Sequence, residues 1–308
     1  MLPRRPVLEQ RIRGNTHAAA GKKLAKTLNR GVSTAAMNQS EKAARFRALH
    51  EQPGAFIFPN PWDGASARLM EAEGFPALAT SSAAHAATLG RRDGRVTRDE
   101  VMAHARLIVE AVDIPVAADL ENGFGASPEM VSETILLAAG TGLVGGSIED
   151  ASGDPAAPLY DLDAATDRII AAVEAARSLP FPFTLTARAE NFVRGNPDLE
   201  DTIRRLQAYE RAGADVLFAP GLPDLDSMRR VCASVNRPVN VIGSVPGKHF
   251  TMPALAAAGA KRVSFGATLY RAAMTGLLEA ARESKQKGAF SFVDGIMTGP
   301  DLSSRLKE

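Results

Sequence analysis

An alternation of short apolar runs with longer amphipathic segments restricts the fold of this chain more than any other feature of its sequence. The pattern occurs eight times between residues 55 and 283. Each short run is typical of a buried β-strand, and each longer segment carries apolar residues at helical spacing. The predicted strands are residues 55–58, 77–80, 116–119, 144–148, 183–187, 216–219, 239–242 and 262–265. The predicted helices are residues 63–73, 98–112, 128–139, 164–178, 198–212, 224–235, 252–258 and 267–283.

Eight consecutive strand–helix pairs predict an α/β fold, the (β/α)₈ barrel of TIM type. Several predicted helices end at a glycine, which tolerates the left-handed backbone common at helix C-termini: Gly74, Gly140, Gly213 and Gly259. The alternative is an open doubly wound sheet, which usually carries a glycine-rich phosphate-binding turn after its first strand. Here residues 59–63, Pro-Asn-Pro-Trp-Asp, follow the first strand. We therefore expect the barrel.

The segments outside the repeat give the predicted domain organisation. Residues 1–36 carry eight lysines and arginines against one acid, Glu9. Such a composition resembles an organelle transit peptide, but nothing else in the chain points to an organelle. We interpret it as a poorly ordered extension before a natural start at Met37. We then expect an N-terminal helix in residues 37–53, the catalytic barrel in 54–285, and a C-terminal tail in 286–308 that packs on the barrel or on a partner subunit.

Composition excludes several classes of protein. The chain of 308 residues has a formal net charge of +1, which does not indicate binding to nucleic acid or to an acidic membrane surface. No apolar run approaches the ~18 residues of a membrane span. The single cysteine, Cys232, excludes an intrachain disulfide framework and a cysteine metal cluster. It suits a reducing compartment, and we expect a cytoplasmic protein.

Two acids lie at the end of the third predicted strand: Asp119 is its last residue and Glu121 comes two residues later. On an extended backbone, side chains two residues apart point to the same side. We therefore expect both carboxylates to face whatever lies beyond the end of the strand. The Gly-Phe-Gly turn at residues 123–125 would let the backbone approach a ligand closely. Converging carboxylates suit a hard divalent cation such as Mg²⁺, and the alternative is a pair of solvated loop acids.

In a (β/α)₈ barrel the catalytic residues lie at the C-terminal ends of the strands. In this chain, acids gather after the second, third and fourth predicted strands, and Arg188 faces them from the end of the fifth. An arginine can hold a carboxylate or a phosphate through two parallel hydrogen bonds. The combination predicts a site for an anionic oxo-acid beside a metal ion.

Three motifs on this repeat resemble those of the isocitrate lyase and phosphoenolpyruvate mutase superfamily. They are Asp-Leu-Glu-Asn-Gly-Phe-Gly at residues 119–125, Ser-Ile-Glu-Asp at 147–150 and Thr-Ala-Arg-Ala-Glu-Asn at 186–191. Their order and spacing agree with the superfamily, and the resemblance covers about residues 56–281. Three ordered motifs on a repeat of the expected period are far more specific than any one of them alone.

The resemblance implies a barrel whose eighth helix is exchanged between subunits of a homodimer or homotetramer. It implies Mg²⁺ or Mn²⁺ as the cofactor and a small anionic oxo-acid as the substrate. The chemistry would be bond cleavage next to a carbonyl, with the metal stabilising an enolate of pyruvate type. The implied metal ligands, some of them acting through water, are Asp93, Asp119, Glu121 and Glu149.

The resemblance also indicates which residues would contact the substrate. Ser81 and the backbone N–H groups that follow it fall where the superfamily holds the substrate carboxylate. Arg188 falls where the superfamily contacts substrate oxygens, and it is also a catalytic candidate. The substrate-binding candidates are Trp62, Ser81, Ser82, Ala83, Arg188 and Asn240.

The chain departs from the lyases of the superfamily in three places. Residues 151–160 lack the Lys-Lys/Arg-Cys-Gly-His segment whose cysteine serves as the acid. Glu121 stands in place of an aspartate, and Pro220 in place of a glutamate. These differences disfavour ordinary isocitrate lyase activity. They favour a lyase or decarboxylase of a smaller oxo-acid, in which Tyr160, His85 or solvent supplies the proton.

Three functional hypotheses follow from these residues. The first is a Mg²⁺-dependent lyase or decarboxylase acting on a small α-oxo or α-hydroxy mono- or dicarboxylic acid. The second keeps the fold and makes or breaks a P–C bond in phosphonopyruvate. The third is a barrel that binds an oxo-acid without turnover. In each, residues 152–160 would form a lid over the site. Cys232 lies within a predicted helix and is interpreted as a small buried hydrophobic residue.

Overall fold

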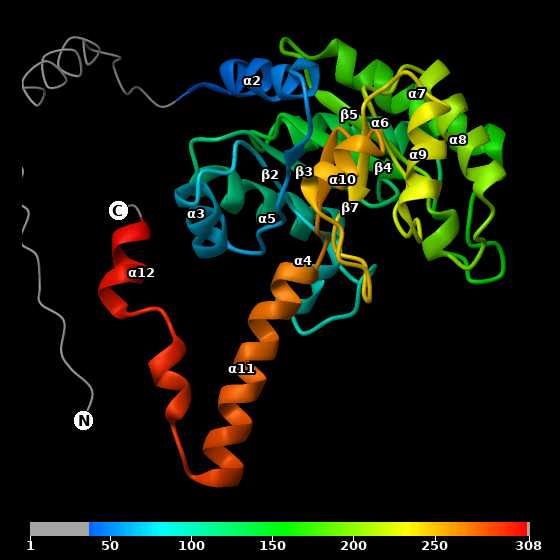
Figure 1. The fold of residues 1–308 in the computed structure, drawn as a ribbon. Helices are drawn as coiled ribbons and strands as arrows, with labels where there is room; N and C mark the ends of the chain where they lie inside the picture. The colour runs from blue at the N-terminus through cyan, green and yellow to red at the C-terminus, as the bar shows by residue number, and fades with distance from the viewer. Residues whose placement is uncertain (1–36, 307–308) are drawn as a thin grey trace, which may run out of the picture. The chain divides into compact units, whose positions relative to one another are not determined.

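The computed structural model describes residues 37–306, and the basic segment 1–36 lies outside the described residues. The described chain forms an eight-stranded parallel sheet that curls on itself, with helices packed around it (Figure 1). The strands are β1 (Phe56–Ile57), β2 (Leu78–Ala79), β3 (Val116–Asp119), β4 (Gly145–Glu149), β5 (Thr184–Arg188), β6 (Val216–Phe218), β7 (Val239–Ile242) and β8 (Arg262–Ser264).

The strands pair in the order β1-β8-β7-β6-β5-β4-β3-β2. The two strands at the ends of this order are brought together by hydrogen bonds just beyond them. The Ala79 N–H donates to the Pro59 carbonyl oxygen at 3.0 Å, and the Asn60 side chain donates to the Thr80 carbonyl oxygen at 3.1 Å. The fold is therefore the predicted α/β barrel of TIM type.

Local sequence explains where the helices begin. The Asp63 carboxylate accepts the Ser66 N–H at 2.7 Å and caps the N-terminus of α3. The helices are α2 (Gln39–Glu51), α3 (Gly64–Ala72), α4 (Ser82–Thr88), α5 (Arg98–Ala111), α6 (Pro128–Ala139), α7 (Leu162–Ser178), α8 (Leu199–Arg211), α9 (Leu225–Ala233), α10 (Met252–Ala257), α11 (Thr268–Lys287) and α12 (Gly299–Arg305). Two 3₁₀ turns are η1 (Asn191–Val193) and η2 (Ser291–Gly295).

Glycine ends three of the four helices predicted to stop in this way. Gly74, Gly213 and Gly259 have φ angles of +85°, +102° and +96°, in the left-handed region. Gly140 keeps a right-handed φ of −65°. The left-handed turn after α6 is made instead by Gly142, whose φ is +95°.

Helix α2 covers the N-terminal end of the barrel. Phe46 is fully buried and stacks on Phe58, with ring centroids 5.3 Å apart. The Gln39 amide donates to the Leu143 carbonyl oxygen at 2.9 Å, in the loop before β4. A small apolar cluster between α2 and the strands therefore closes the lower end of the barrel. The open end lies at the C-terminal ends of the strands.

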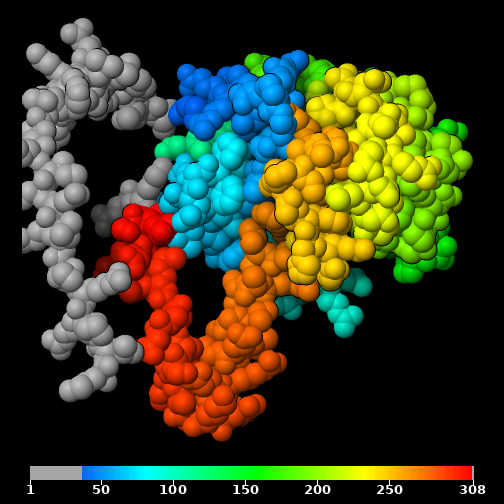
Figure 2. All heavy atoms as spheres, viewed as in Figure 1, coloured from blue at the N-terminus to red at the C-terminus, as the bar shows by residue number. Residues whose placement is uncertain are grey.

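Three helices differ from the sequence-based expectation, one of them being α12, which lies in the segment expected as a tail. Helix α4 was expected as a loop, because Ser82–Thr88 is a short alanine-rich segment without amphipathic spacing. Helix α11 extends four residues further than predicted and contains no buried residue. Figure 2 shows α11, in orange, standing out from the barrel. Within residues 37–306, no helix combines the length and apolar character needed to cross a membrane.

Candidate active site

A pocket of about 160 Å³ opens inside the barrel toward the C-terminal ends of the strands. This volume is well below the ~300–1,000 Å³ typical of pockets for drug-sized ligands, so the pocket suits a small molecule. Seven residues predicted from the sequence line it: Ser81, Ser82, Ala83, Asp93, Asp119, Arg188 and Asn240.

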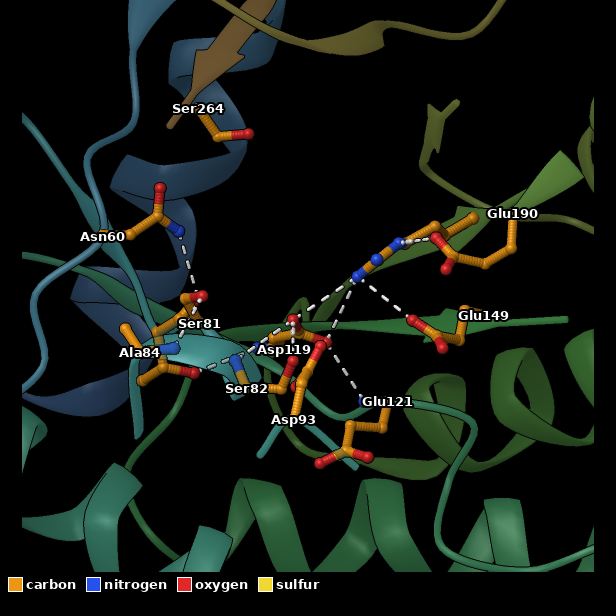
Figure 3. A network of polar contacts seen from close by, with 12 residues as sticks. Asn60, Ser81, Ser82, Ala84, Asp93, Asp119, Glu121, Glu149, Glu190 and Ser264 are labelled. Atoms are coloured by element: carbon orange, nitrogen blue, oxygen red, sulfur yellow. Dashed lines mark hydrogen bonds and ion pairs between the residues drawn. The ribbon is translucent and has the colours of Figure 1, made fainter. Parts of the chain in front are cut away.

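Asp119 ends β3 and is held by donors from two neighbouring segments. The Ser82 hydroxyl and backbone N–H donate to its Oδ2 at 3.0 and 3.3 Å, and the Glu121 N–H donates to its Oδ1 at 3.1 Å. In Figure 3, Ser81 and Ser82 lie on one side of Asp119, and Glu149 and Glu190 lie on the other. Asp119 therefore occupies the centre of the polar network at the pocket mouth.

Arg188 ends β5 and lies among acids. Its Nη1 is 3.4 Å from Asp119 Oδ2 and 3.1 Å from Glu149 Oε2, and its Nε donates to Glu190. Arg194 adds a second cation, with Nη2 2.9 Å from Glu149 Oε1. Burial raises the pKa of Glu149 to about 8, although Arg188 acts in the opposite direction. When Glu149 is ionised, its carboxylate forms ion pairs with both Arg188 and Arg194.

Glu121 does not lie on an extended backbone, so the geometric argument that aligned it with Asp119 is wrong. The strand ends at Asp119, and Glu121 has a left-handed φ of +48°. Its side chain still lies close enough to Asp119 and Asp93 to interact with both carboxylates. Burial, then Asp119 and Asp93, raise the pKa of Glu121 to about 7. Its Oε1 is buried without a hydrogen-bond partner.

A buried arginine from α7 fixes the turn that carries Glu121. The Arg168 guanidinium donates to the carbonyl oxygens of Asn122 and Gly125, the latter at 2.7 Å, and lies 4.3 Å from the centre of the Tyr160 ring. Phe124, in the same turn, has a φ of +61°. Left-handed conformations cost non-glycine residues free energy, and the arginine hydrogen bonds help to hold them.

Asp150 supports the acids on the opposite side of the pocket. It is buried, and its Oδ1 accepts the Glu190 backbone N–H at 2.8 Å. Its Oδ2 accepts from the Tyr209 hydroxyl at 2.7 Å and from Arg205 Nη1 at 3.0 Å. Asp150 therefore anchors the loop after β5.

The donor set at the pocket mouth fits a divalent cation. In the part of the chain that the structure describes, no three His, Cys, Asp or Glu side chains form a ready-made metal cluster. However, Oε1 of Glu121 is buried without a hydrogen-bond partner, and burial and neighbouring acids raise its pKa because they disfavour the ionised form. A cation bound next to Glu121 would stabilise that ionised form. Oxygen donors are the ligands that Mg²⁺ prefers. The residues that could supply them are Asp93, Asp119, Glu121 and Glu149.

Five predicted site residues do not line the pocket. Glu121 and Glu149 contact the lining residues Asp119 and Arg188, whereas Trp62, His85 and Tyr160 make other contacts. Trp62 packs edge-on against Tyr270, with ring centroids 5.5 Å apart. His85 lies in α4 and stacks on His104, with centroids 3.9 Å apart. Burial, then His104, lower the pKa of His85 to about 4, so it is neutral at pH 7 and ill suited to donate a proton. The ring of Tyr160 lies against Arg168 instead. The geometry does not support these three roles.

Two arginines near the pocket were not singled out from the sequence. Arg194 follows a 3₁₀ turn, so no strand pattern brought it to the site. Arg262 begins β8, lines the pocket and contacts residues far away in the sequence, Asn240 and Thr186. The ladder pairs Asn240 with Arg262. Only the register of the barrel could have predicted this contact.

Comparison with known proteins gives a consistent assignment. The family profile described as phosphoenolpyruvate phosphomutase matches residues 46–285. The chain is similar to a crystal structure from Burkholderia cenocepacia J2315 that is provisionally described as a lyase/mutase. The two share 52% identity over 86% of this chain and 95% of that one, with a TM-score of 0.85.

Two relatives with named activities cover most of the barrel. The 2-methylisocitrate lyase of Aeropyrum pernix is 30% identical over 79% of each chain. The oxaloacetate decarboxylase of Bradyrhizobium diazoefficiens is 31% identical over 66% of this chain and 70% of its own. These matches confirm the resemblance that the three strand-end motifs indicated. The chain belongs to the phosphoenolpyruvate phosphomutase family, within the superfamily of carbon–carbon lyases and mutases that includes isocitrate lyase.

Proposed function

We propose that this chain is a Mg²⁺- or Mn²⁺-dependent lyase or decarboxylase. It would cleave a carbon–carbon bond next to the carbonyl or hydroxyl group of a small α-oxo or α-hydroxy mono- or dicarboxylic acid. One observation carries this proposal. Four carboxylates interact with two arginines at the pocket mouth, a fifth acid, Asp93, interacts with Glu121, and the Oε1 of Glu121 is buried without a donor. The acids are Asp93, Asp119, Glu121, Glu149 and Glu190.

Each group has a separate role in this proposal. Asp93, Asp119, Glu121 and Glu149 would hold the ion, in part through water, and the bound ion would polarise the substrate carbonyl. Arg188 would bind the substrate oxygens, since it lines the pocket next to Asp119, with Nη1 3.4 Å from Asp119 Oδ2. Because the Tyr160 ring lies against Arg168 and the His85 ring stacks on His104, we assign the proton supply to solvent.

The test is a panel of small oxo- and hydroxy-acids incubated with the protein and Mg²⁺. We expect release of pyruvate, glyoxylate or CO₂ that depends on the metal and stops with EDTA. Phosphate release or a new phosphorus NMR signal from phosphonopyruvate would establish the P–C alternative instead. Ligand-induced thermal stabilisation without any turnover would establish the binding barrel. An active protein that does not respond to EDTA would contradict the metal-dependent proposal.

We further propose that α11 and the tail after it pack on a second copy of the chain, as a homodimer or homotetramer. Leu277 on α11 and Ile296 beyond η2 are 60% and 59% exposed, and large apolar side chains at this exposure are typical of interfaces. Within the same chain, α12 pairs through Arg305 with Glu73 near α3, so the segment that we place on the second copy runs from α11 to Ile296. The compartment that we propose is the cytoplasm.

Light scattering after gel filtration tests the assembly. We expect a dimer or tetramer for the unmodified protein and a smaller species for Leu277→Asp. The matched control is Leu137→Asp, which changes a leucine on α6 that is 41% exposed and should leave the assembly unchanged. A monomeric unmodified protein would contradict this proposal without affecting the catalytic one.

A further inference from the structure

The inner part of the pocket contains a second arginine whose surroundings differ from those of Arg188. Arg262 Nε donates to Asn240 Oδ1 at 2.9 Å, and Nη2 donates to Thr186 Oγ1 at 3.0 Å. Nη1 lies 3.3 Å from His50 Nε2, and the guanidinium lies 4.7 Å from the centre of the Phe58 ring. Arg262 is 4% exposed.

None of these contacts supplies a negative charge. His50 Nδ1 lies 2.9 Å from the Phe46 carbonyl oxygen, which can only accept, so Nδ1 carries the hydrogen and Nε2 accepts from Arg262. Burial, then Arg262, lower the pKa of His50 to about 3, which keeps the ring neutral. Among the described residues, no carboxylate forms an ion pair with Arg262. A buried cation without a counter-charge costs several kcal/mol.

The guanidinium keeps hydrogen-bonding capacity for a ligand. An arginine side chain has five N–H donors, and the three contacts above engage one donor each. Arg262 lines the pocket together with Asn240, Thr186 and Phe58. The pocket lining also includes the small side chains of Ala79 on β2 and Ala117 on β3. An anion in the inner pocket could therefore reach the guanidinium.

We propose that Arg262 forms an anion subsite at the inner end of the pocket, and that it selects a dicarboxylate over a monocarboxylate. This inference rests on the proposed function, because the other end of the ligand would lie at the acids and Arg188. Arg262 reaches Thr186, which is two residues before Arg188 on β5, or about 6–7 Å along the strand. A four- or five-carbon dicarboxylate spans roughly that distance.

Calorimetric titration with unreactive probes tests the subsite. Succinate and butyrate have the same chain length and differ by one carboxylate. With Mg²⁺ present, we expect succinate to bind the unmodified protein at least about tenfold more tightly than butyrate. A charged hydrogen-bonding partner contributes about 10- to 100-fold in affinity. Arg262→Met should weaken succinate binding by that factor and bring the two acids within about twofold of each other.

Two further variants separate a binding role from a structural one. Arg262→Lys keeps the charge and should retain most of the preference for succinate. Arg237→Met removes an exposed arginine from the lower end of the barrel and should change neither titration. If Arg262 only orients Asn240, Arg262→Met will weaken succinate and butyrate equally, which would overturn the proposal. Absence of succinate binding to the unmodified protein would also overturn it.

The outcomes distinguish this inference from the proposed function. Titration with Mg²⁺ alone and metal-dependent turnover test the pocket mouth and do not involve Arg262. Turnover with no preference for dicarboxylates would refute the subsite and leave the function intact. A preference for succinate that depends on Arg262, in a protein that neither binds Mg²⁺ nor turns over any oxo-acid, would support the subsite and refute the function.

Discussion

The mouth and the inner end of the pocket each contain one buried arginine, and the two have opposite electrostatic surroundings. Arg188 forms ion pairs with Asp119, Glu149 and Glu190. Arg262 is hydrogen-bonded only to neutral groups. Burial lowers the pKa of Arg262 to about 9. Burial also acts to lower the pKa of Arg188, but the acids around it more than offset this and raise its pKa above the usual value.

This difference shows how one barrel can present two kinds of binding site a short distance apart. The mouth has more negative than positive side chains, so it favours a cation. The inner end has a positive charge without a partner, so it favours an anion. A small acid coordinated to a metal ion matches both ends at once. The following variants test this difference in charge between the mouth and the inner end of the pocket, from the largest expected effect to the smallest.

The largest effect is expected at the mouth. Asp119→Ala removes the central carboxylate of the polar network and should reduce metal-dependent turnover by about 1,000-fold or more, since metal-ion catalysis supplies several kcal/mol. The fold should survive, because Asp119 contributes only its side chain to these contacts. Activity is measured with the best acid of the panel, and circular dichroism checks the fold. The matched control, Asp226→Ala, removes a carboxylate that is 88% exposed. Full activity in Asp119→Ala would refute the metal assignment.

Removing Arg188 should destabilise the protein, whereas removing Arg262 should not. Arg188→Met leaves Glu149 and Glu190 with Arg194 as their remaining cation, and both acids are at least 94% buried. Breaking a buried ion pair from one side costs about 3–5 kcal/mol, so we expect a loss near ~3 kcal/mol in the free energy of unfolding. Arg262→Met removes an unpaired buried cation.

We therefore expect Arg262→Met to be as stable as the unmodified protein, or more stable. Urea denaturation without metal or ligand measures both variants. An equal loss of stability in both would show that the two arginines are structurally equivalent, and the comparison between the two ends of the pocket would fail.

The third test uses the raised pKa of Glu121. Because its pKa is about 7 in the folded protein, the folded state binds more protons than the unfolded state between pH 4.5 and 7. Without metal, this group's contribution to stability is present at low pH and is lost as the pH rises through about 7. Mg²⁺ needs the ionised carboxylate, so its affinity should rise over the same range.

Glu121→Gln should remove the part of both pH dependences that Glu121 contributes, leaving the part due to Glu149, and should weaken Mg²⁺ binding at pH 8 by about tenfold, because one charged ligand is lost. Calorimetry between pH 5 and 8 measures the affinity, and thermal unfolding over the same range measures stability. If the pH profile of Mg²⁺ binding is the same in Glu121→Gln as in the unmodified protein, another group governs the titration and Glu121 does not hold the ion.

The sequence predicted the fold and the strand bounds better than the positions of the side chains in the site. β3 and β7 have the predicted bounds because each apolar run directly follows a proline. The orientation of Glu121 could not be predicted, since it depends on a left-handed turn held by Arg168 from another helix. The subsite around Arg262 was missed because its partners, Thr186 and Asn240, come from two other strands.

The smallest effect is expected outside the pocket. Cys232 lies in α9, packs near Gly259 and does not line the pocket. Burial raises the pKa of its thiol to about 11, so it stays protonated at neutral pH and is neither a nucleophile nor a ready acid. Cys232→Ser should therefore change turnover and the succinate preference by less than about twofold. A loss of turnover above about 100-fold, roughly 2.7 kcal/mol of barrier, would mean that a group outside both ends of the pocket supplies the proton. The different electrostatic surroundings of Arg188 and Arg262 would then explain substrate binding but not the proton transfer.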